Sequence, residues 1–189
     1  MPYTEKFEDA LLYAARLHRD QTRKGTGVPY VTHLLAVAAI VGENGGTEDE
    51  VISGLLHDAS EDAGGEERLA EIRDRFGDGV ADVVAGCTDT YEDPKPPWRA
   101  RKEAYLDHLA EASSSVRLVS AADKLHNARS VLSDYRAVGE DLWDRFNGGR
   151  YGTLWYYRAV ADALAGDGQV ADELGRAVAE LECAADGRG

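Results

Sequence analysis

The chain has 189 residues, of which 43% are hydrophobic and 30% are charged, and its formal net charge is −14. This length and composition are typical of one globular domain, and the apolar runs are too short for a membrane span. The negative charge argues against nucleic acid as a partner, because proteins that bind a phosphate backbone present basic surfaces. If the ligand is a phosphorylated small molecule, local cations or a metal ion must reverse the electric field where it binds.

Helical periodicity dominates the pattern of apolar residues. These residues recur at helical spacing in segments that are separated by stretches containing Gly, Pro or Ser. Thr32 is expected to cap the second helix, and Thr47 with Glu50 has the spacing of a capping box at the start of the third. In chain order we expect helices over residues 7–18, 33–44, 48–62, 66–77, 78–89, 99–112 and 116–135, and two more towards the C-terminus.

The fold class follows from these elements. No stretch alternates polar and apolar residues as a half-buried strand would. We therefore predict an all-α fold, a single helical bundle of about nine helices over residues 1–189. Its core is expected over about residues 4–165, and a C-terminal helix over about residues 168–184.

The cysteines and the first residues indicate a cytoplasmic protein. Cys87 and Cys183 lie far apart and belong to no CxxC pair, which fits a reducing compartment. The segment MPYTEKFEDALL is acidic and lacks the pattern of a secretory signal. We expect no membrane partner, and a homo-oligomer is compatible with the sequence.

The segment GLLHDASEDAG, residues 54–64, places several polar groups directly after an apolar run. On a continuous helix His57 would lie above Glu61, and Asp58 above Asp62, because residues four apart align. The preceding leucines indicate a helix that runs through the interior, so this polar turn is expected to face a cleft. The alternative is a solvated helix end.

Two further residues could complete a metal site with this His-Asp pair. His33 begins an otherwise apolar helix, and Asp123 lies among small and apolar residues, where an unpaired carboxylate is unfavourable. Two imidazoles and two carboxylates suit Mn²⁺, Fe²⁺ or Zn²⁺. Taken alone, His33 could be an ordinary buried histidine, and Asp123 could form an ion pair with Arg117 or Lys124.

Three segments together resemble a known family. The blocks RKGTGVPYVTH, LLHDASED and AADKLHNARS occur in this order at residues 23–33, 55–62 and 121–130. They are similar to the HD-domain metal-dependent phosphohydrolases, and in particular to the alarmone hydrolases of the stringent response and their small stand-alone relatives. The resemblance implies an HD-type helical bundle that removes the 3′-diphosphate from guanosine 3′,5′-bis(diphosphate), usually with Mn²⁺.

The resemblance also implies roles for individual residues near the ion. Glu61 and Asp62 correspond to an acidic pair that acts on the attacking water and the phosphate chain. The chain departs from the family at Leu34, where Pro is common, and at Ala63, where Thr is common. The positions that correspond to metal ligands are His33, His57, Asp58 and Asp123.

Substrate contacts are implied for a second group of residues. Arg23 and Lys24 fall where the family has an Arg-Lys pair near guanine and ribose. Asn127 matches a substrate-binding asparagine, and Ser130 shares its helix face. Arg150 is a candidate phosphate ligand, although the match to the family is loose beyond residue 140.

The expected function is therefore metal-dependent hydrolysis of a small phosphorylated nucleotide, with pyrophosphate as a product and one divalent ion, Mn²⁺, as the cofactor. A second hypothesis is a phosphatase on another nucleotide, such as the ribose phosphate of NADPH, which would release orthophosphate instead. A third is a non-catalytic nucleotide-binding relative, which would have no need for clustered carboxylates.

Overall fold

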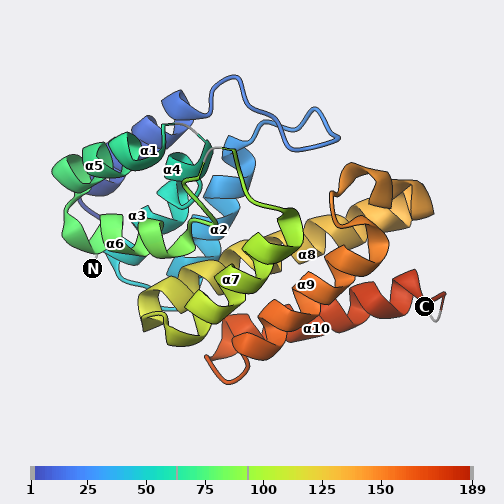
Figure 1. Ribbon diagram of the computed structural model, residues 1–189. Helices are drawn as coiled ribbons and strands as arrows, with labels where there is room; N and C mark the ends of the chain where they lie inside the picture. Colours follow the sequence, from blue (N-terminus) through green and yellow to red (C-terminus); the bar gives the residue numbers. More distant parts are fainter. Residues whose placement is uncertain (1–2, 63, 93, 188–189) are drawn as a thin grey trace.

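The computed structural model describes residues 3–62, 64–92 and 94–187, except for the side chain of Asp62. This part of the chain is all-α, with ten α-helices and one 3₁₀-helix, which confirms the predicted fold class (Figure 1). Its only β feature is an isolated bridge between Thr22 and Pro29. The helices are α1 (Glu5–Leu17), α2 (Val31–Glu43), α3 (Glu48–Leu56), α4 (Ala59–Asp62), α5 (Gly65–Phe76), α6 (Asp78–Cys87), α7 (Trp98–Glu111), α8 (Ser114–Val138), η1 (Gly139–Arg145), α9 (Gly149–Ala163) and α10 (Gln169–Ala185).

Helix α8 connects the two halves of the molecule. It packs against α2, α3 and α6 on one side and against α9 and α10 on the other (Figure 1). Its first turn is capped by Ser113, whose hydroxyl accepts a hydrogen bond from Val116 N–H. Side chains near the middle of α8 are therefore surrounded by other helices, and Asp123 is one of them.

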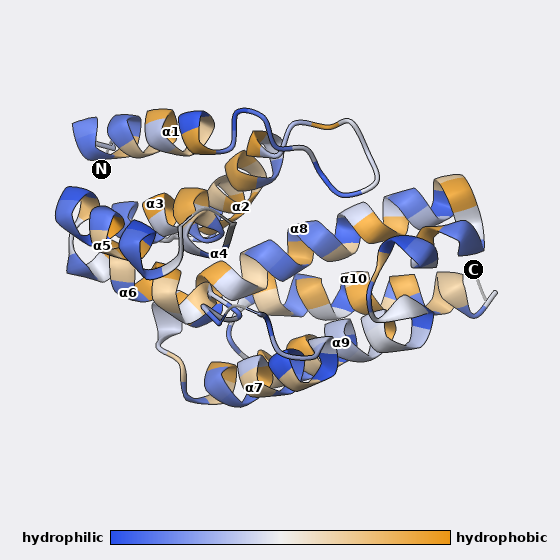
Figure 2. Cartoon of the chain, turned by 45° about the horizontal axis from the view of Figure 1, so that its top comes forward, coloured by the Kyte–Doolittle hydropathy of each residue, from blue (hydrophilic) through white to orange (hydrophobic). Residues whose placement is uncertain are grey.

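Helices α2 and α3 form a tightly packed pair. Figure 2 shows that hydrophobic residues prevail along α2. A Cβ atom on Gly54 in α3 would lie 3.1 Å from Cα of Ala38 in α2, so glycine permits the close approach of the two backbones. A short connection joins the helices, so they run antiparallel, and the start of α2 lies beside the end of α3.

Two expectations about helix starts have different outcomes. The capping box is confirmed, because Thr47 Oγ1 accepts from Glu50 N–H and the Glu50 carboxylate accepts from Thr47 N–H. The expectation that Thr32 caps the second helix is wrong. Helix α2 begins at Val31, and Thr32 Oγ1 donates to the carbonyl oxygen of Pro29 at 2.8 Å.

The predicted helix over residues 48–62 is interrupted. Helix α3 ends at Leu56, α4 begins at Ala59, and the turn between them contains His57 and Asp58. The expected stacking of these residues on Glu61 and Asp62 along one helix is therefore wrong. The break redirects the chain, so that the His-Asp pair and the acidic pair are carried by separate elements.

Within the described residues, no helix combines the length and apolar character that crossing a membrane requires.

Candidate metal centre

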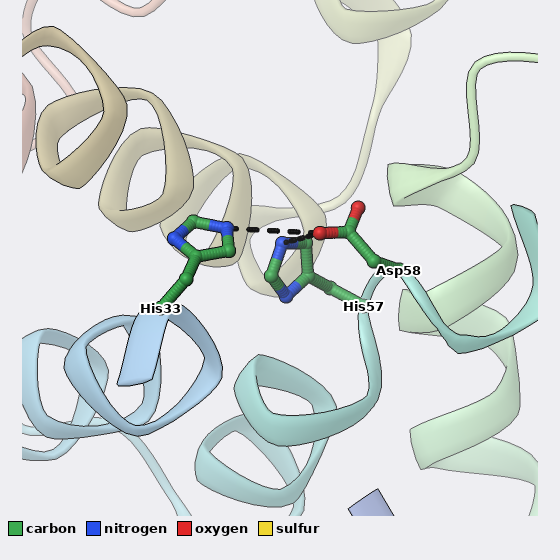
Figure 3. A group of neighbouring side chains, drawn as sticks. All are labelled: His33, His57 and Asp58. Carbon is green, nitrogen blue, oxygen red and sulfur yellow. Dashed lines mark ion pairs between the residues drawn. The ribbon is translucent and has the colours of Figure 1, made fainter. Parts of the chain in front are cut away.

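Four side chains from three parts of the fold converge on one point. His33 comes from the first turn of α2, His57 and Asp58 from the turn after α3, and Asp123 from the middle of α8. Nε2 of His57 lies 2.9 Å from Oδ2 of Asp58 and 3.7 Å from Oδ1 of Asp123. Nε2 of His33 lies 3.6 Å and 3.2 Å from the same two oxygens, and Figure 3 shows both rings directed towards Asp58.

The two imidazoles are suited to a cation rather than to a structural hydrogen bond. Both rings are buried, with 1–2% of His33 and His57 exposed. Among the described residues, neither Nε2 atom has a hydrogen-bond partner, although carboxylate oxygens lie close to both. Buried polar atoms are normally satisfied, so two unsatisfied nitrogens that face two carboxylates fit the donor set of a divalent metal site. The group His33, His57 and Asp58 also has ligand atoms within 4.8 Å of one another.

Hydrogen bonds behind the ligands orient the two rings. Nδ1 of His57 donates to the carbonyl oxygen of Gly54 at 2.9 Å, which leaves its Nε2 lone pair facing the cluster. Nδ1 of His33 lies 2.8 Å from Nδ1 of His126. Burial and the neighbouring His33 and Arg23 lower the pKa of His126 to about 4, so Nδ1 of a neutral His126 can accept a hydrogen bond from Nδ1–H of His33.

The two carboxylates are held in the ionised form by their neighbours. Burial by itself raises the pKa of Asp58, but His57 and His33 together outweigh burial and lower that pKa well below its usual range. For Asp123, burial is likewise outweighed, first by Lys124, which pairs with Oδ2. Burial would lower the pKa of His57, yet Asp58 and then Asp123 raise it well above its usual value. The same negative field favours a divalent cation, which competes with protons for these ligands.

The loop between α1 and α2 is connected to this cluster by hydrogen bonds from two of its side chains. Tyr30 donates its hydroxyl hydrogen to Oδ2 of Asp58 at 2.5 Å. Arg23 donates to Oδ1 of Asn127 at 2.6 Å, and Nδ2 of Asn127 donates to Oδ1 of Asp123 at 2.5 Å. The loop turns sharply at Gly25, whose φ of +75° favours glycine. This turn directs the predicted Arg-Lys pair towards the cluster.

Two clefts adjoin the cluster. The basic cleft has a volume of about 420 Å³ and is lined by Lys24, Glu61, Asp89, Lys95, Trp98, Arg101, Lys102, Lys124, Asn127, Phe146, Asn147, Gly148, Thr153, Tyr156 and Tyr157. The loop cleft has a volume of about 650 Å³ and is lined by Arg23, Lys24, Thr26, Val28, Tyr30, Thr32, His126, Asn127, Arg129, Ser130, Val131, Ser133, Asp134, Phe146 and Tyr157.

Among the described residues, the linings of the two clefts include none of the four candidate ligands, but they do include side chains that contact these ligands directly. Lys124, which pairs with Asp123, lines the basic cleft. Tyr30 and His126, which contact Asp58 and His33, line the loop cleft. Asn127 lines both clefts. A molecule bound at the cluster could therefore extend into either cleft.

The predicted acidic pair is placed only in part. Glu61 lines the basic cleft, where its Oε1 lies 2.9 Å from Nζ of Lys95 and its Oε2 accepts from Asp89 N–H at 3.3 Å. Its side chain is 22% exposed. Asp62 is the last residue of α4, but its side chain lies outside the described part of the chain.

The predicted substrate contacts separate into two groups. Arg23, Lys24, Asn127 and Ser130 all line the loop cleft. Arg150 points elsewhere: its guanidinium donates to the carbonyl oxygen of Ala185 and to Asp186 at the end of α10. Among the described residues, the linings of the two clefts do not include it.

Several residues of the site were missed in the sequence. Tyr30 and His126 lie inside the quoted blocks, so their proximity to predicted ligands was the available signal. Lys124 was expected only as a possible ion-pair partner of Asp123, and the structure contains that pair. Arg101 and Lys102 belong to the basic segment RARK at the start of α7, after a proline-rich loop. Nothing in the spacing of that segment indicates that α7 brings it beside α8.

Comparisons with known proteins agree with this geometry. The chain is 36% identical over 126 residues to the guanosine-3′,5′-bis(diphosphate) 3′-pyrophosphohydrolase MESH1 of Xenopus tropicalis. The aligned region covers 65% of this chain and 68% of that protein. It is 34% identical over 137 residues to a GTP pyrophosphokinase of Myxococcus xanthus, over 69% of this chain but only 18% of that protein.

A solved structure is similar over nearly the whole chain. It is described as a metazoan ortholog of SpoT that hydrolyses ppGpp, and it matches with a TM-score of 0.75 and 26% identity over 96% of both chains. The sequence profile of the family described as "HD domain" matches residues 10–154, which include all four candidate metal ligands. The chain therefore belongs to the HD-domain family.

Proposed function

We propose that this protein is a metal-dependent phosphohydrolase that removes the 3′-diphosphate from guanosine 3′,5′-bis(diphosphate) or a closely related nucleotide. The observation that carries the proposal is the pair of buried, unsatisfied Nε2 atoms that face two ionised carboxylates, next to residues that line two clefts. The similarity to MESH1 and to the ppGpp-hydrolysing ortholog of SpoT supports the choice of substrate.

The charge of the clefts fits a phosphorylated substrate. The chain carries a net charge of −14, yet Arg23, Lys24 and Arg129 line the loop cleft, and within the described part of the chain Asp134 is the only carboxylate in that lining. Local cations of this kind attract an anion into a protein that would otherwise repel it. Arg23 and Lys24 would bind substrate in the ground state and the transition state alike.

One divalent ion, which the family resemblance implies is Mn²⁺, would be held by His33, His57, Asp58 and Asp123. When bound, such an ion supplies Lewis acidity towards a phosphate oxygen and lowers the pKa of water. The mixed nitrogen and oxygen ligands suit Mn²⁺, Fe²⁺ and Zn²⁺.

The chain's own groups would handle the protons. Attack of water on the first phosphorus of the 3′-diphosphate forms one P–O bond and breaks the bond to the ribose 3′-oxygen. Glu61 would orient that water and accept its proton, and its position in the lining of the basic cleft beside Lys95 supports this role. The ribose oxygen then takes up a proton, so the products are pyrophosphate and a nucleotide with a free 3′-hydroxyl. Asp62 is proposed to assist Glu61.

The test is an assay of the purified chain with guanosine 3′,5′-bis(diphosphate) and Mn²⁺ in which pyrophosphate and orthophosphate are scored separately. We expect pyrophosphate as the first product, and its loss in His57→Ala. Release of orthophosphate from a ribose monophosphate such as that of NADPH, without pyrophosphate from the alarmone, would favour the phosphatase instead. A chain that binds Mn²⁺ but hydrolyses neither would contradict the proposal.

A further inference from the structure

The basic cleft contains more positive charge than its own carboxylates balance. Among the residues that the structure describes, five cationic side chains and two carboxylates line it: Lys24, Lys95, Arg101, Lys102 and Lys124 against Glu61 and Asp89. Lys124 is paired with Asp123, and Lys95 with Glu61. The remaining excess of cations is unexpected in so acidic a chain, and it lies next to the candidate metal centre.

Asp89 forms ion pairs with two of these cationic side chains. Its Oδ2 accepts from the Arg101 guanidinium and lies 3.1 Å from Nζ of Lys102. The Asp89 side chain is 6% exposed, and those of Arg101 and Lys102 are 12% and 18% exposed. Arg101 is held further by the carbonyl oxygen of Pro96, to which Nε donates at 3.1 Å. One carboxylate thus positions two cations that are largely withdrawn from water.

The carboxylates described near Lys102 do not fully balance the positive charge of its ammonium group. Burial lowers the pKa of Lys102 to about 8, and the positive charge of Lys124 adds to this effect. The other charged groups that face it are Glu61, Arg101 and Asp123, together with the Asp89 carboxylate. Nζ of Lys102 lies over the ring of Tyr156, 4.9 Å from the ring centroid, and Tyr156 also lines the basic cleft. A bound anion would relieve the repulsion among these cations.

The basic cleft also lies on the side of the metal centre where Glu61 would orient the attacking water. Glu61, the candidate group that orients water, lines this cleft and not the loop cleft. The loop cleft contains Arg23, Ser130 and the Tyr30 ring, which are suited to a nucleoside. A diphosphate whose first phosphorus lies at the metal centre would therefore direct its second phosphate into the basic cleft.

We propose that Lys95, Arg101 and Lys102 bind the terminal phosphate of the diphosphate group that is hydrolysed, and that this contact selects a diphosphate over a monophosphate at that position. The inference rests on the proposed function, because it assigns the direction in which the same substrate lies. It makes the basic cleft the site from which pyrophosphate leaves.

The experiment compares Lys102→Met and Lys95→Met with the control Arg99→Met. Methionine keeps much of the apolar stem and removes only the charge. Arg99 lies on the same helix, has a 53% exposed side chain and pairs with Glu103, so its replacement removes one positive charge outside the cleft. The substrates are guanosine 3′,5′-bis(diphosphate) and guanosine 5′-diphosphate 3′-monophosphate.

We expect Lys102→Met to lower kcat/KM for the 3′-diphosphate by about tenfold or more and to change that for the 3′-monophosphate by less than about threefold. Lys95→Met should act in the same direction but more weakly, because its side chain is 47% exposed. The inhibition constant of inorganic pyrophosphate should rise about tenfold in Lys102→Met and stay unchanged in Arg99→Met. Equal losses on both substrates, or unchanged inhibition by pyrophosphate, would overturn the inference.

A failure of the proposed function would look different. If the unaltered protein hydrolyses neither substrate, calorimetry with pyrophosphate alone still tests the cleft. Weaker binding to Lys102→Met than to Arg99→Met would support a pyrophosphate site, and equal binding would overturn it.

Discussion

Replacement of Tyr30 by Phe tests whether the loop between α1 and α2 supports the metal centre. The Tyr30 hydroxyl donates to Oδ2 of Asp58 at 2.5 Å, a short hydrogen bond to an ionised group. Such a bond contributes about 1.5–3 kcal/mol, and about 1.4 kcal/mol corresponds to a tenfold change in an equilibrium constant. Asp58 keeps its 2.9 Å contact with His57, and its side chain is 23% exposed, so water can replace part of the lost bond. We therefore expect the Kd for Mn²⁺ to rise by about 10- to 100-fold in Tyr30→Phe.

The measurement is titration calorimetry with Mn²⁺ in the absence of nucleotide, which separates metal affinity from catalysis. Phenylalanine keeps the ring that stacks on His18 at a centroid distance of 5.3 Å, so the thermal midpoint without metal should change little. Tyr151→Phe serves as the control, because Tyr151 is 81% exposed. An unchanged Kd for Mn²⁺ in Tyr30→Phe would show that this hydroxyl does not position a metal ligand.

Three further predictions concern catalysis and substrate binding. Glu61→Gln should retain Mn²⁺ but lose at least about a hundredfold in kcat, since the amide cannot accept a proton; a normal turnover rate would remove Glu61 from the reaction. Arg23→Ala and Lys24→Ala should mainly raise KM in steady-state kinetics, because uniform binding is lost, and unchanged kinetics in both would exclude the loop from the site. Binding of pyrophosphate should weaken as the pH rises above about 8, because the pKa of Lys102 is about 8 and only the ammonium form attracts the anion. A bound anion shifts that midpoint upwards, and a Lys102→Met variant with the same pH dependence would refute the assignment.

Local sequence predicted most of the helices and the set of candidate ligands. The capping box of Thr47 and Glu50 and the serine before α8 mark helix starts through contacts within a few residues, so they could be predicted without knowledge of the fold. The ligand set was readable because unpaired polar groups in apolar surroundings are rare. His33, His57 and Asp123 stood out for that reason.

The prediction from local periodicity was wrong at a position where a contact between residues distant in the sequence is present. The helix predicted through His57 and Asp58 is interrupted there. The position of Glu61 relative to His57 is therefore not the one that a continuous helix would give. Asp58 instead faces Tyr30, which lies 28 residues away in the sequence. Periodicity describes only neighbours along the chain and contains no information about such a partner.

The composition determined that a phosphorylated ligand needs local positive charge, because a chain with a net charge of −14 repels an anion. The three sequence blocks indicated the candidate metal ligands and the Arg-Lys pair. Only the tertiary structure decided that α7 carries Arg101 and Lys102 to the cleft beside α8, and that Arg150 turns to the end of α10. The physical reason is that the electrostatic field at a site is the sum over groups that are close in space. Packing of α7, α8 and α9 against one another determines which charges are close, and that packing depends on side chains distributed over the whole chain.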